Sequence, residues 1–202
     1  MIGILSYGVG NIKAIEKVFN HLRVPVKILT NPEEVKNVEK LILPGVGAFD
    51  YAMRKFSDSG FKKVVLDRVQ NEGVPILGIC VGMQMLAFNS EEGELPGLGL
   101  VPGTVKKFSH DFSKFPLPHM GWNEVSPSSQ NRLIFEELEN PRFYFLHSFY
   151  FECENSENEL ARCTYENEFV CAVQNKNVFG VQFHPEKSHH FGVKLIENFS
   201  KL

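Results

Sequence analysis

The pentapeptide Gly78-Ile79-Cys80-Val81-Gly82 joins an apolar, strand-like run to the start of a helix. A cysteine at such a junction sits on a sharp turn that presents its thiol at the edge of a sheet, the geometry of a nucleophile elbow. The turn holds its central residue in a strained backbone conformation, and side chains in place of the flanking glycines would crowd the neighbouring backbone. The sequence therefore predicts a nucleophilic cysteine at position 80.

A candidate base lies far downstream, in the run His184-Pro185-Glu186. Free thiols are mostly protonated near neutral pH, so a nucleophilic cysteine needs a base or a positive electrostatic setting. The N-terminus of the helix after Cys80 favours negative charge, and His184 is placed to take the proton. Glu186 can orient the imidazole and stabilise its charged form. The predicted catalytic residues are Cys80, His184 and Glu186.

Bulk composition restricts the class of protein. The 202 residues are 43% hydrophobic and 22% charged, which suits a single globular domain over residues 1–202. A formal net charge of -3 and the absence of a Lys/Arg cluster argue against a nucleic-acid partner. The sequence has neither a signal-peptide pattern nor a membrane-length apolar stretch, so we expect a cytoplasmic protein without a membrane partner. The four cysteines lack CxxC spacing, which predicts free thiols and neither disulfides nor bound metal.

The first half of the chain alternates short apolar runs with helical patterns. Strands are predicted at residues 2–6, 26–29, 41–43 and 74–79, and helices at residues 11–22, after the cap Asn31, between 49 and 71, and at 81–88. This alternation predicts an α/β fold of three layers, with an open, mostly parallel sheet covered by helices on both faces. Ligands bind outside the carboxyl ends of the strands in such sheets.

After residue 93 the pattern changes to Gly and Pro punctuation between β-rich runs. These runs lie at residues 105–108, 143–151, 160–165, 169–174 and 178–183. They predict a C-terminal antiparallel addition to the sheet, with a tight hairpin at residues 175–177. A final helix is predicted at residues 188–200.

A second glycine loop, Pro44-Gly45-Val46-Gly47, follows a buried strand at the same predicted sheet edge. Alone it predicts an ordinary turn, but beside a cysteine elbow we expect it to form an oxyanion hole. The backbone N–H of Val46 would join that of Val81 across the developing charge, and losing one such donor typically costs about two to three orders of magnitude in rate.

Two other sequence patterns suggest binding sites but do not predict them. The loop at residues 7–11 contains Gly-x-Gly but lacks the third glycine of the dinucleotide fingerprint, so no nucleotide site is predicted. Adjacent residues of a helix point apart, so His189 and His190 are expected to be solvated rather than to bind a metal. We expect no cofactor.

Together these runs resemble the class I, triad-type glutamine amidotransferases over nearly the whole chain. The elbow and the His-Pro-Glu run are shared throughout that family. The resemblance is closest to the glutaminase subunits of imidazole glycerol phosphate synthases, from histidine biosynthesis, whose signatures appear here as the loop at residues 44–47 and the run Pro118-His119-Met120-Gly121-Trp122-Asn123. Other family members usually carry a Gly-Gly-Pro version of the loop.

The resemblance implies that Cys80 attacks the side-chain amide of L-glutamine, that His184 protonates the departing ammonia, and that water cleaves the glutamyl thioester. It implies an oxyanion hole around Gly45, Val46, Gly47 and Val81. It also implies that the substrate-binding residues are Gln84, His147 and Ser148. Finally, it implies a heterodimer in which ammonia passes to a (βα)8-barrel cyclase subunit, with contacts at Trp122, Asn123 and Lys187.

Two departures from the family pattern leave an alternative open. Ser6 stands where the family usually has Asp, and Phe149 stands where Tyr is common. A paralogue that delivers ammonia to a different acceptor, as in a sugar amidination pathway, fits these differences. A cysteine peptidase on the same architecture is a second alternative, against which Gln84 and the glycine loop argue. A non-catalytic scaffold is the third, and it would require a broken triad.

Overall fold

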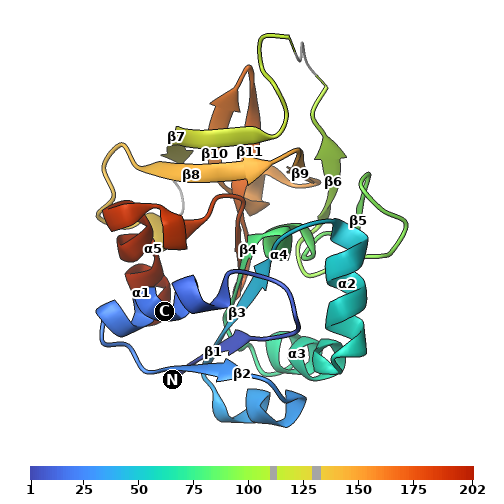
Figure 1. Ribbon diagram of the computed structural model, residues 1–202, viewed down its shortest axis with the longest axis vertical. Coiled ribbons are helices and arrows are strands. Elements are labelled where there is room, and N and C mark those ends of the chain that lie inside the picture. The colour runs from blue at the N-terminus through green and yellow to red at the C-terminus, as the bar shows by residue number, and fades with distance from the viewer. Residues whose placement is uncertain (110–112, 129–132) are drawn as a thin grey trace.

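The computed structural model describes residues 1–109, 113–128 and 133–202 (Figure 1). Five strands pair in parallel in the order β2-β1-β3-β4-β12, which confirms the predicted parallel sheet. These strands are β1 (Ile2–Leu5), β2 (Val26–Leu29), β3 (Lys40–Gly45), β4 (Ile76–Cys80) and β12 (Val178–Val181). Strands β1 and β4 are buried at every position, as expected of a sheet covered on both faces.

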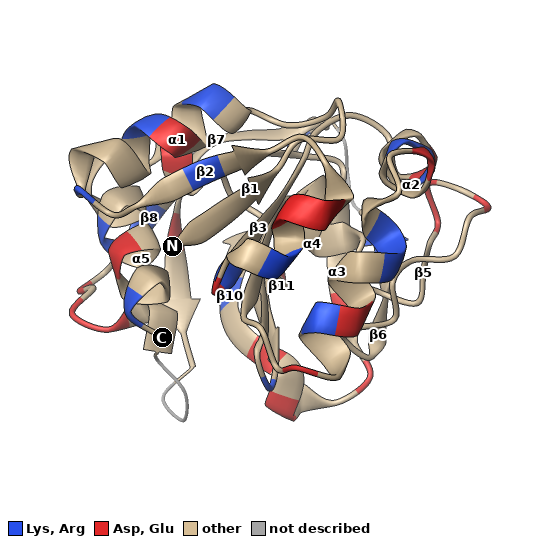
Figure 2. Cartoon of the chain, turned by 90° about the horizontal axis from the view of Figure 1, so that it is seen from below, with Lys and Arg blue, Asp and Glu red and all other residues tan. Residues whose placement is uncertain are grey.

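Helices cover both faces of this parallel sheet, as predicted. Helices α1 and α5 lie on one face, and α2 and α3 lie on the other (Figures 1 and 2). Their bounds are α1 (Ile12–His21), α2 (Phe49–Asp58), α3 (Phe61–Gln70) and α5 (His189–Lys201). Each helix buries apolar residues three or four positions apart, such as Ala52 and Phe56 of α2, and therefore packs with one stripe toward the sheet.

The predicted antiparallel addition begins at β11 (Asn167–Asn175), which pairs with β12. The two strands are joined at Lys176, in the left-handed region at φ +54, which confirms the hairpin. The sheet continues through β10 (Glu159–Tyr165), β7 (His119–Pro127) and β8 (Arg142–His147). A side branch consists of β5 (Asn89–Ser90), β6 (Gly103–Lys107) and β9 (Phe149–Cys153).

Two predicted elements differ in extent. The β-rich run predicted at residues 143–151 forms two strands rather than one, because the chain changes partners at Ser148: β8 pairs with β7, whereas β9 pairs with β6 and β11. The helix predicted at residues 81–88 is shorter, because α4 (Val81–Gln84) ends where the backbone turns toward the next loop. The N–H of Phe88 donates to the carbonyl of Gly103 at 2.9 Å, which replaces a helical hydrogen bond.

Two further local features follow from side-chain chemistry. Asn31 caps a helix as predicted, but that helix is a short 3₁₀ segment, Pro32–Asn37. Strand β7 was not predicted, because its exposed face carries the apolar Met120 and Trp122 and its inner face the polar His119, the reverse of the usual pattern. Further 3₁₀ segments span Leu133–Phe135, Ser156–Asn158 and Pro185–Lys187.

Aromatic packing links the core to the start of the His-Pro-Glu run. The rings of Phe143 and Phe183 stack with centroids 3.9 Å apart, and Phe145 packs edge-on against Phe183. All three side chains are fully buried. Because Phe183 immediately precedes His184, this cluster fixes the backbone from which the predicted base projects.

Charges of both signs are mixed over the surface of the molecule. Figure 2 shows Lys and Arg alternating with Asp and Glu along the helices and the loops that join them. Among residues 1–109, 113–128 and 133–202, no helix has the length and apolarity needed to cross a bilayer.

Candidate active site

Cys80 occupies a strained turn between β4 and α4. Its backbone lies at φ 56 and ψ -115, a conformation that L-residues rarely adopt. A Cβ on Gly82 would lie 2.0 Å from the carbonyl oxygen of Leu43, and one on Gly78 would lie 2.6 Å from the carbonyl oxygen of Gly82. The expected elbow is therefore present, and both glycines are needed because backbone atoms approach them too closely for a side chain.

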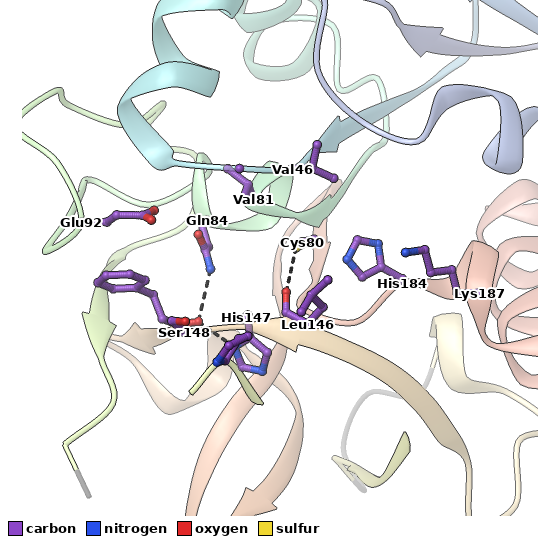
Figure 3. Close-up of a pocket in the computed structure, with 13 residues that line it drawn as sticks. Val46, Cys80, Val81, Gln84, Glu92, Leu146, His147, Ser148, His184 and Lys187 are labelled. Atoms are coloured by element: carbon purple, nitrogen blue, oxygen red, sulfur yellow. Dashed lines mark hydrogen bonds between the residues drawn. The ribbon is translucent and has the colours of Figure 1, made fainter. Parts of the chain in front are cut away.

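A cavity of about 300 Å³ opens at the carboxyl ends of the parallel strands, beside Cys80 (Figure 3). Its walls come from the elbow, the loop after β3, the junction of β8 and β9, and the loop after β12. The lining includes Val46, Gly47, Val81, Gln84, Glu92, Leu146, His147, Ser148, His184 and Lys187. The structure thus brings together residues that lie more than one hundred positions apart in the sequence.

His184 lies in the wall of the cavity and is fixed by hydrogen bonds from both its side chain and its backbone. Its Nδ1 lies 2.9 Å from a carboxylate oxygen of Glu186, and its backbone N–H donates to the carbonyl of Tyr144 at 2.9 Å. The side chains of His184 and Glu186 are almost wholly buried. Burial alone would lower the pKa of His184, but hydrogen bonds to the side chains of Cys80 and Glu186 outweigh it and raise the pKa to about 10. This environment favours the imidazolium form.

The sulfur of Cys80 has two further polar neighbours. The thiol donates to the carbonyl oxygen of Leu146 at 3.9 Å, and the side-chain amide of Gln182 donates to the sulfur at 3.8 Å. The carbonyl suits the neutral thiol, whereas the amide N–H suits the thiolate. The sulfur therefore lies between groups that prefer opposite charge states.

The glycine loop after β3 packs directly against the start of α4. A Cβ on Gly45 would lie 2.3 Å from the backbone nitrogen of Gly82, so the two backbones are in contact. Gly47 adopts φ +86, which favours glycine. The buried hydroxyl of Tyr7 donates to the carbonyl of Pro44, at the foot of this loop. The loop is therefore anchored beside the nucleophile.

Comparisons with known proteins agree with this geometry. The family model for class I glutamine amidotransferases matches residues 4–201. The chain belongs to this family. It is 52% identical over 204 residues to imidazole glycerol phosphate synthase subunit HisH of Leptospira borgpetersenii, and 52% identical over 205 residues to the same subunit of Bdellovibrio bacteriovorus, with both chains covered in full in each case. It is therefore an amidotransferase of the HisH type.

Solved structures support the fold. A glutamine amidotransferase crystal structure superposes with a TM-score of 0.78 at 20% identity, covering 99% of this chain and 97% of the other. A glutamine amidotransferase from Thermotoga maritima superposes with a TM-score of 0.65 at 18% identity, covering 99% of this chain and 82% of the other. The predicted α/β sheet with its antiparallel addition is the class I glutamine amidotransferase fold.

In this amidotransferase, the predicted substrate residues differ in what they can offer. Gln84 and Ser148 both line the cavity. His147 also lines it, but both of its ring nitrogens bind protein groups: Nδ1 lies 2.7 Å from the carbonyl oxygen of Phe149, and Nε2 lies 2.9 Å from Nδ1 of His119. His147 therefore presents ring carbons, rather than a hydrogen-bonding nitrogen, to a ligand.

The predicted partner contacts separate into outward and inward residues. Trp122 is exposed and stacks on His189, with ring centroids 5.1 Å apart. The Lys187 ammonium lies over the ring of Tyr144, 5.5 Å from its centroid, at the edge of the cavity. Asn123 instead points inward, because its amide donates to the carbonyl of Thr164 at 2.8 Å. Neighbouring strand residues alternate in direction, so Trp122 and the half-buried Asn123 point to opposite faces of β7.

Sequence reasoning missed three residues of the site. Glu92 lines the cavity and accepts a hydrogen bond from the backbone N–H of Phe49 at 2.9 Å. Tyr7 anchors the glycine loop, and Gln182 contacts the sulfur. Gln182 could have been found, because it directly follows β12, at the strand end that leads to His184. Glu92 could not, since no periodic pattern marks the loop after α4.

The loop at residues 7–11, discounted above as a nucleotide site, contacts the catalytic residues. The amide of Asn11 donates to the carboxylate of Glu186 at 3.4 Å, and the hydroxyl of Tyr7 donates to Pro44 of the glycine loop. The other three cysteines are free thiols, and burial raises the pKa of Cys153 and Cys163 to about 12. Within the described part of the chain, no group of three or more His, Cys, Asp or Glu is arranged to hold a metal ion.

Proposed function

We propose that the protein hydrolyses L-glutamine through Cys80, His184 and Glu186 and delivers the ammonia to a cyclase subunit of imidazole glycerol phosphate synthase. The observation that carries the proposal is the hydrogen-bonded group at the cavity, in which a cysteine on an elbow meets a buried histidine paired with a carboxylate. The full-length likeness to HisH subunits supports the same reaction.

In the first half-reaction, His184 holds the proton of Cys80 as the imidazolium that the site favours, and the sulfur forms a bond to the amide carbon of glutamine. The negative charge that develops on the amide oxygen is stabilised by the backbone N–H groups of Val46 and Val81. His184 then gives its proton to the amide nitrogen, the carbon–nitrogen bond breaks, and ammonia leaves. Glu186 stabilises the imidazolium during both transfers.

The second half-reaction regenerates the thiol. His184, now neutral, takes a proton from water as the water oxygen attacks the glutamyl thioester. The same N–H groups stabilise the second oxyanion, and the carbon–sulfur bond breaks to give glutamate. His184 returns its proton to the sulfur, so one water is consumed for each ammonia released.

The polar lining of the cavity suits an amino acid. Burial raises the pKa of the half-buried Glu92 above its usual range, and the ammonium group of glutamine would compensate by pairing with this carboxylate. Gln84 and Ser148 supply neutral hydrogen-bonding groups for the rest of the backbone portion of the substrate. The proposed substrate-binding residues are therefore Gln84, Ser148 and Glu92. His147 would help to position them rather than bind the substrate itself.

The surface around the cavity mouth suits a protein partner. Met120, Trp122 and Leu146 are large apolar residues that remain 64%, 39% and 36% exposed, and Met120 and Leu146 are paired across β7 and β8. Lys187 adds a positive charge at the cavity edge. We assign this docking surface, made of Met120, Trp122, Leu146 and Lys187, to a (βα)8-barrel cyclase. Direct transfer there would keep ammonia from being protonated in water.

The identity of the barrel partner would show which molecule accepts the ammonia. Two similar proteins have numbered names, HisH 2 of Pseudomonas aeruginosa at 42% identity and HisH 1 of Campylobacter jejuni at 40%, which keeps a paralogous ammonia donor as the second candidate. Co-purification with a phosphate-binding barrel synthase that forms imidazole glycerol phosphate would support the histidine pathway. A barrel partner with another acceptor would support the paralogue.

The cysteines are free thiols, as is typical of proteins in a reducing compartment, which supports a cytoplasmic location.

The proposed reaction is tested by measuring glutamate release from glutamine, with and without the cyclase subunit. We expect Cys80→Ala to lower turnover by at least about three orders of magnitude, because the covalent intermediate cannot form. Cys153→Ala is the matched control, since its thiol is outside the cavity lining, and it should retain full turnover. Undiminished turnover in Cys80→Ala would contradict the proposal.

A further inference from the structure

A chain of buried and partly buried hydrogen bonds runs from β7, beside the docking surface, to the sulfur of Cys80. Its members lie in the middle of the molecule, between β7, the β8–β9 junction, α4 and the end of β12. In order, they are Asn123, His119, His147, the carbonyl of Phe149, Gln84, Gln182 and Cys80. The direction of each bond can be assigned from the groups that can only accept.

The histidine end of this chain has one consistent arrangement of protons. The carbonyl oxygen of Phe149 can only accept, so Nδ1 of His147, 2.7 Å away, carries a proton. Burial, helped by the nearby His119, lowers the pKa of His147 to about 3, so the ring is neutral and its Nε2 is an acceptor. Nδ1 of His119, 2.9 Å from that Nε2, must then donate. Burial lowers the pKa of His119 to about 4, which keeps this ring neutral as well.

The same carbonyl fixes the two glutamine amides. It accepts a second hydrogen bond from Nε2 of Gln84, at 3.2 Å, so the amino end of that amide must face Phe149. Nε2 of Gln84 also donates to Oε1 of Gln182, at 3.1 Å. With its oxygen engaged there, Gln182 must turn its own amino end toward Cys80, and its Nε2 lies 3.8 Å from the sulfur.

We propose that Gln182 is a further catalytic residue, which stabilises the thiolate of Cys80 by donating an N–H hydrogen bond to the sulfur. The inference rests on the proposed role of Cys80 as nucleophile. A donor that faces an ionised acceptor is roughly twice as effective as one that faces a neutral group. The side chain of Gln182 is fully buried, so water does not compete for its N–H. This contact offsets the carbonyl of Leu146, which holds the neutral thiol.

The position of Gln182 predicts which kinetic constant it affects. It lies behind the sulfur and does not line the cavity, so it has no direct contact with bound glutamine. Losing its N–H should lower kcat, while KM for glutamine stays within about threefold because Gln84 keeps its bond to Phe149.

The test is the rate at which the full-length chain, alone and with its cyclase subunit, is alkylated at Cys80 by iodoacetamide. Peptide mass spectrometry identifies the labelled thiol. Two uncharged variants remove the donor: Gln182→Met has similar length but no N–H, and Gln182→Asn withdraws the amide by one methylene. Both should be alkylated about tenfold more slowly near pH 7, and their rates should approach the wild-type rate at high pH, where ionisation no longer limits the reaction.

Asn198→Leu is the matched control. Asn198 is also a buried amide, and it donates to the carbonyls of Ile134 and Glu136 away from the cavity. Its loss should lower the free energy of unfolding and leave alkylation unchanged. An unchanged alkylation rate near pH 7 in either folded Gln182 variant would overturn the inference. Glutaminase activity that survives Cys80→Ala would instead overturn the proposed function, so the two failures are distinguishable.

Discussion

At the scale of single residues, the charge of His184 is set by two neighbours. The imidazole lies 2.9 Å from Glu186 and also bonds the side chain of Cys80, and these contacts overcome the effect of burial on its pKa. A group whose pKa is higher in the folded state than in the unfolded state binds its proton more tightly when the protein is folded. Its protonation therefore stabilises the fold, and this stabilisation is lost as the pH rises through the folded-state pKa. Stability should therefore depend on pH through this residue.

The pKa of His184 rises from 6.5 to about 10 on folding, so its contribution to stability is complete below about pH 6.5 and is lost as the pH rises through about 10. Glu186→Gln removes one of the groups that raise this pKa. We therefore expect a smaller fall in the free energy of unfolding between these pH values in Glu186→Gln than in the wild type. Urea unfolding at a series of pH values measures it. Glu152→Gln, at an exposed carboxylate, serves as control, and parallel pH profiles for wild type and Glu186→Gln would refute the assignment.

Most residues of the candidate site could be predicted because they belong to local patterns. Cys80 is recognisable from its flanking glycines, and His184 and Glu186 from their spacing. The direction of a side chain is harder to predict, as Asn123 and His147 show. Asn123 turns inward and His147 uses both ring nitrogens within the protein, because each depends on partners from distant strands.

At the scale of elements, the junction of β4 and α4 depends on contacts between backbones. A Cβ on Gly82 would lie 2.0 Å from the carbonyl of Leu43 on the neighbouring strand, and that backbone cannot move without disturbing β3. The elbow is thus fixed by the sheet around it and not by the turn alone.

Gly82→Ala should therefore lower the free energy of unfolding by about 3 kcal/mol or more. Gly8→Ala separates strain from crowding, because Gly8 adopts φ +90 with no atom within 4 Å of the added Cβ. It should cost only about 1–2 kcal/mol. Chemical denaturation of both variants measures the difference. Equal losses would mean that the close approach at Gly82 is relieved by small shifts.

The parallel half of the sheet could be predicted more fully than the antiparallel half. Strands such as β4 are buried on both faces and give continuous apolar runs bounded by glycine or proline. Strand β7 escaped prediction because its exposed face carries Met120 and Trp122, and the β8–β9 pair was predicted as one strand because the change of partner at Ser148 leaves no mark in the apolar pattern.

At the scale of the whole molecule, the docking surface concentrates exposed apolar residues beside the cavity mouth. Large aromatic residues at the centre of an interface usually dominate its binding energy. Trp122 is held in place by its stack on His189, so little order is lost when a partner covers it.

Trp122→Ala should weaken binding of the cyclase subunit by about 2 kcal/mol, or roughly thirtyfold in Kd. Titrating the stimulation of glutaminase activity with the cyclase subunit measures this affinity. Phe88→Ala is the control, because Phe88 is similarly exposed, at 42%, but lies outside β7 and β8. Equal affinities for Trp122→Ala and the wild type would place the partner elsewhere.

Leu146 connects the surface of the molecule directly with the sulfur of Cys80. Its side chain belongs to the docking surface, while its own carbonyl oxygen accepts from the thiol of Cys80. The wall between the outside of the molecule and its reactive atom is therefore one amino acid thick at this point. A protein that displaced the side chain of Leu146 would therefore also displace the carbonyl oxygen that contacts the sulfur. The change would pass through a single residue, without the movement of any helix.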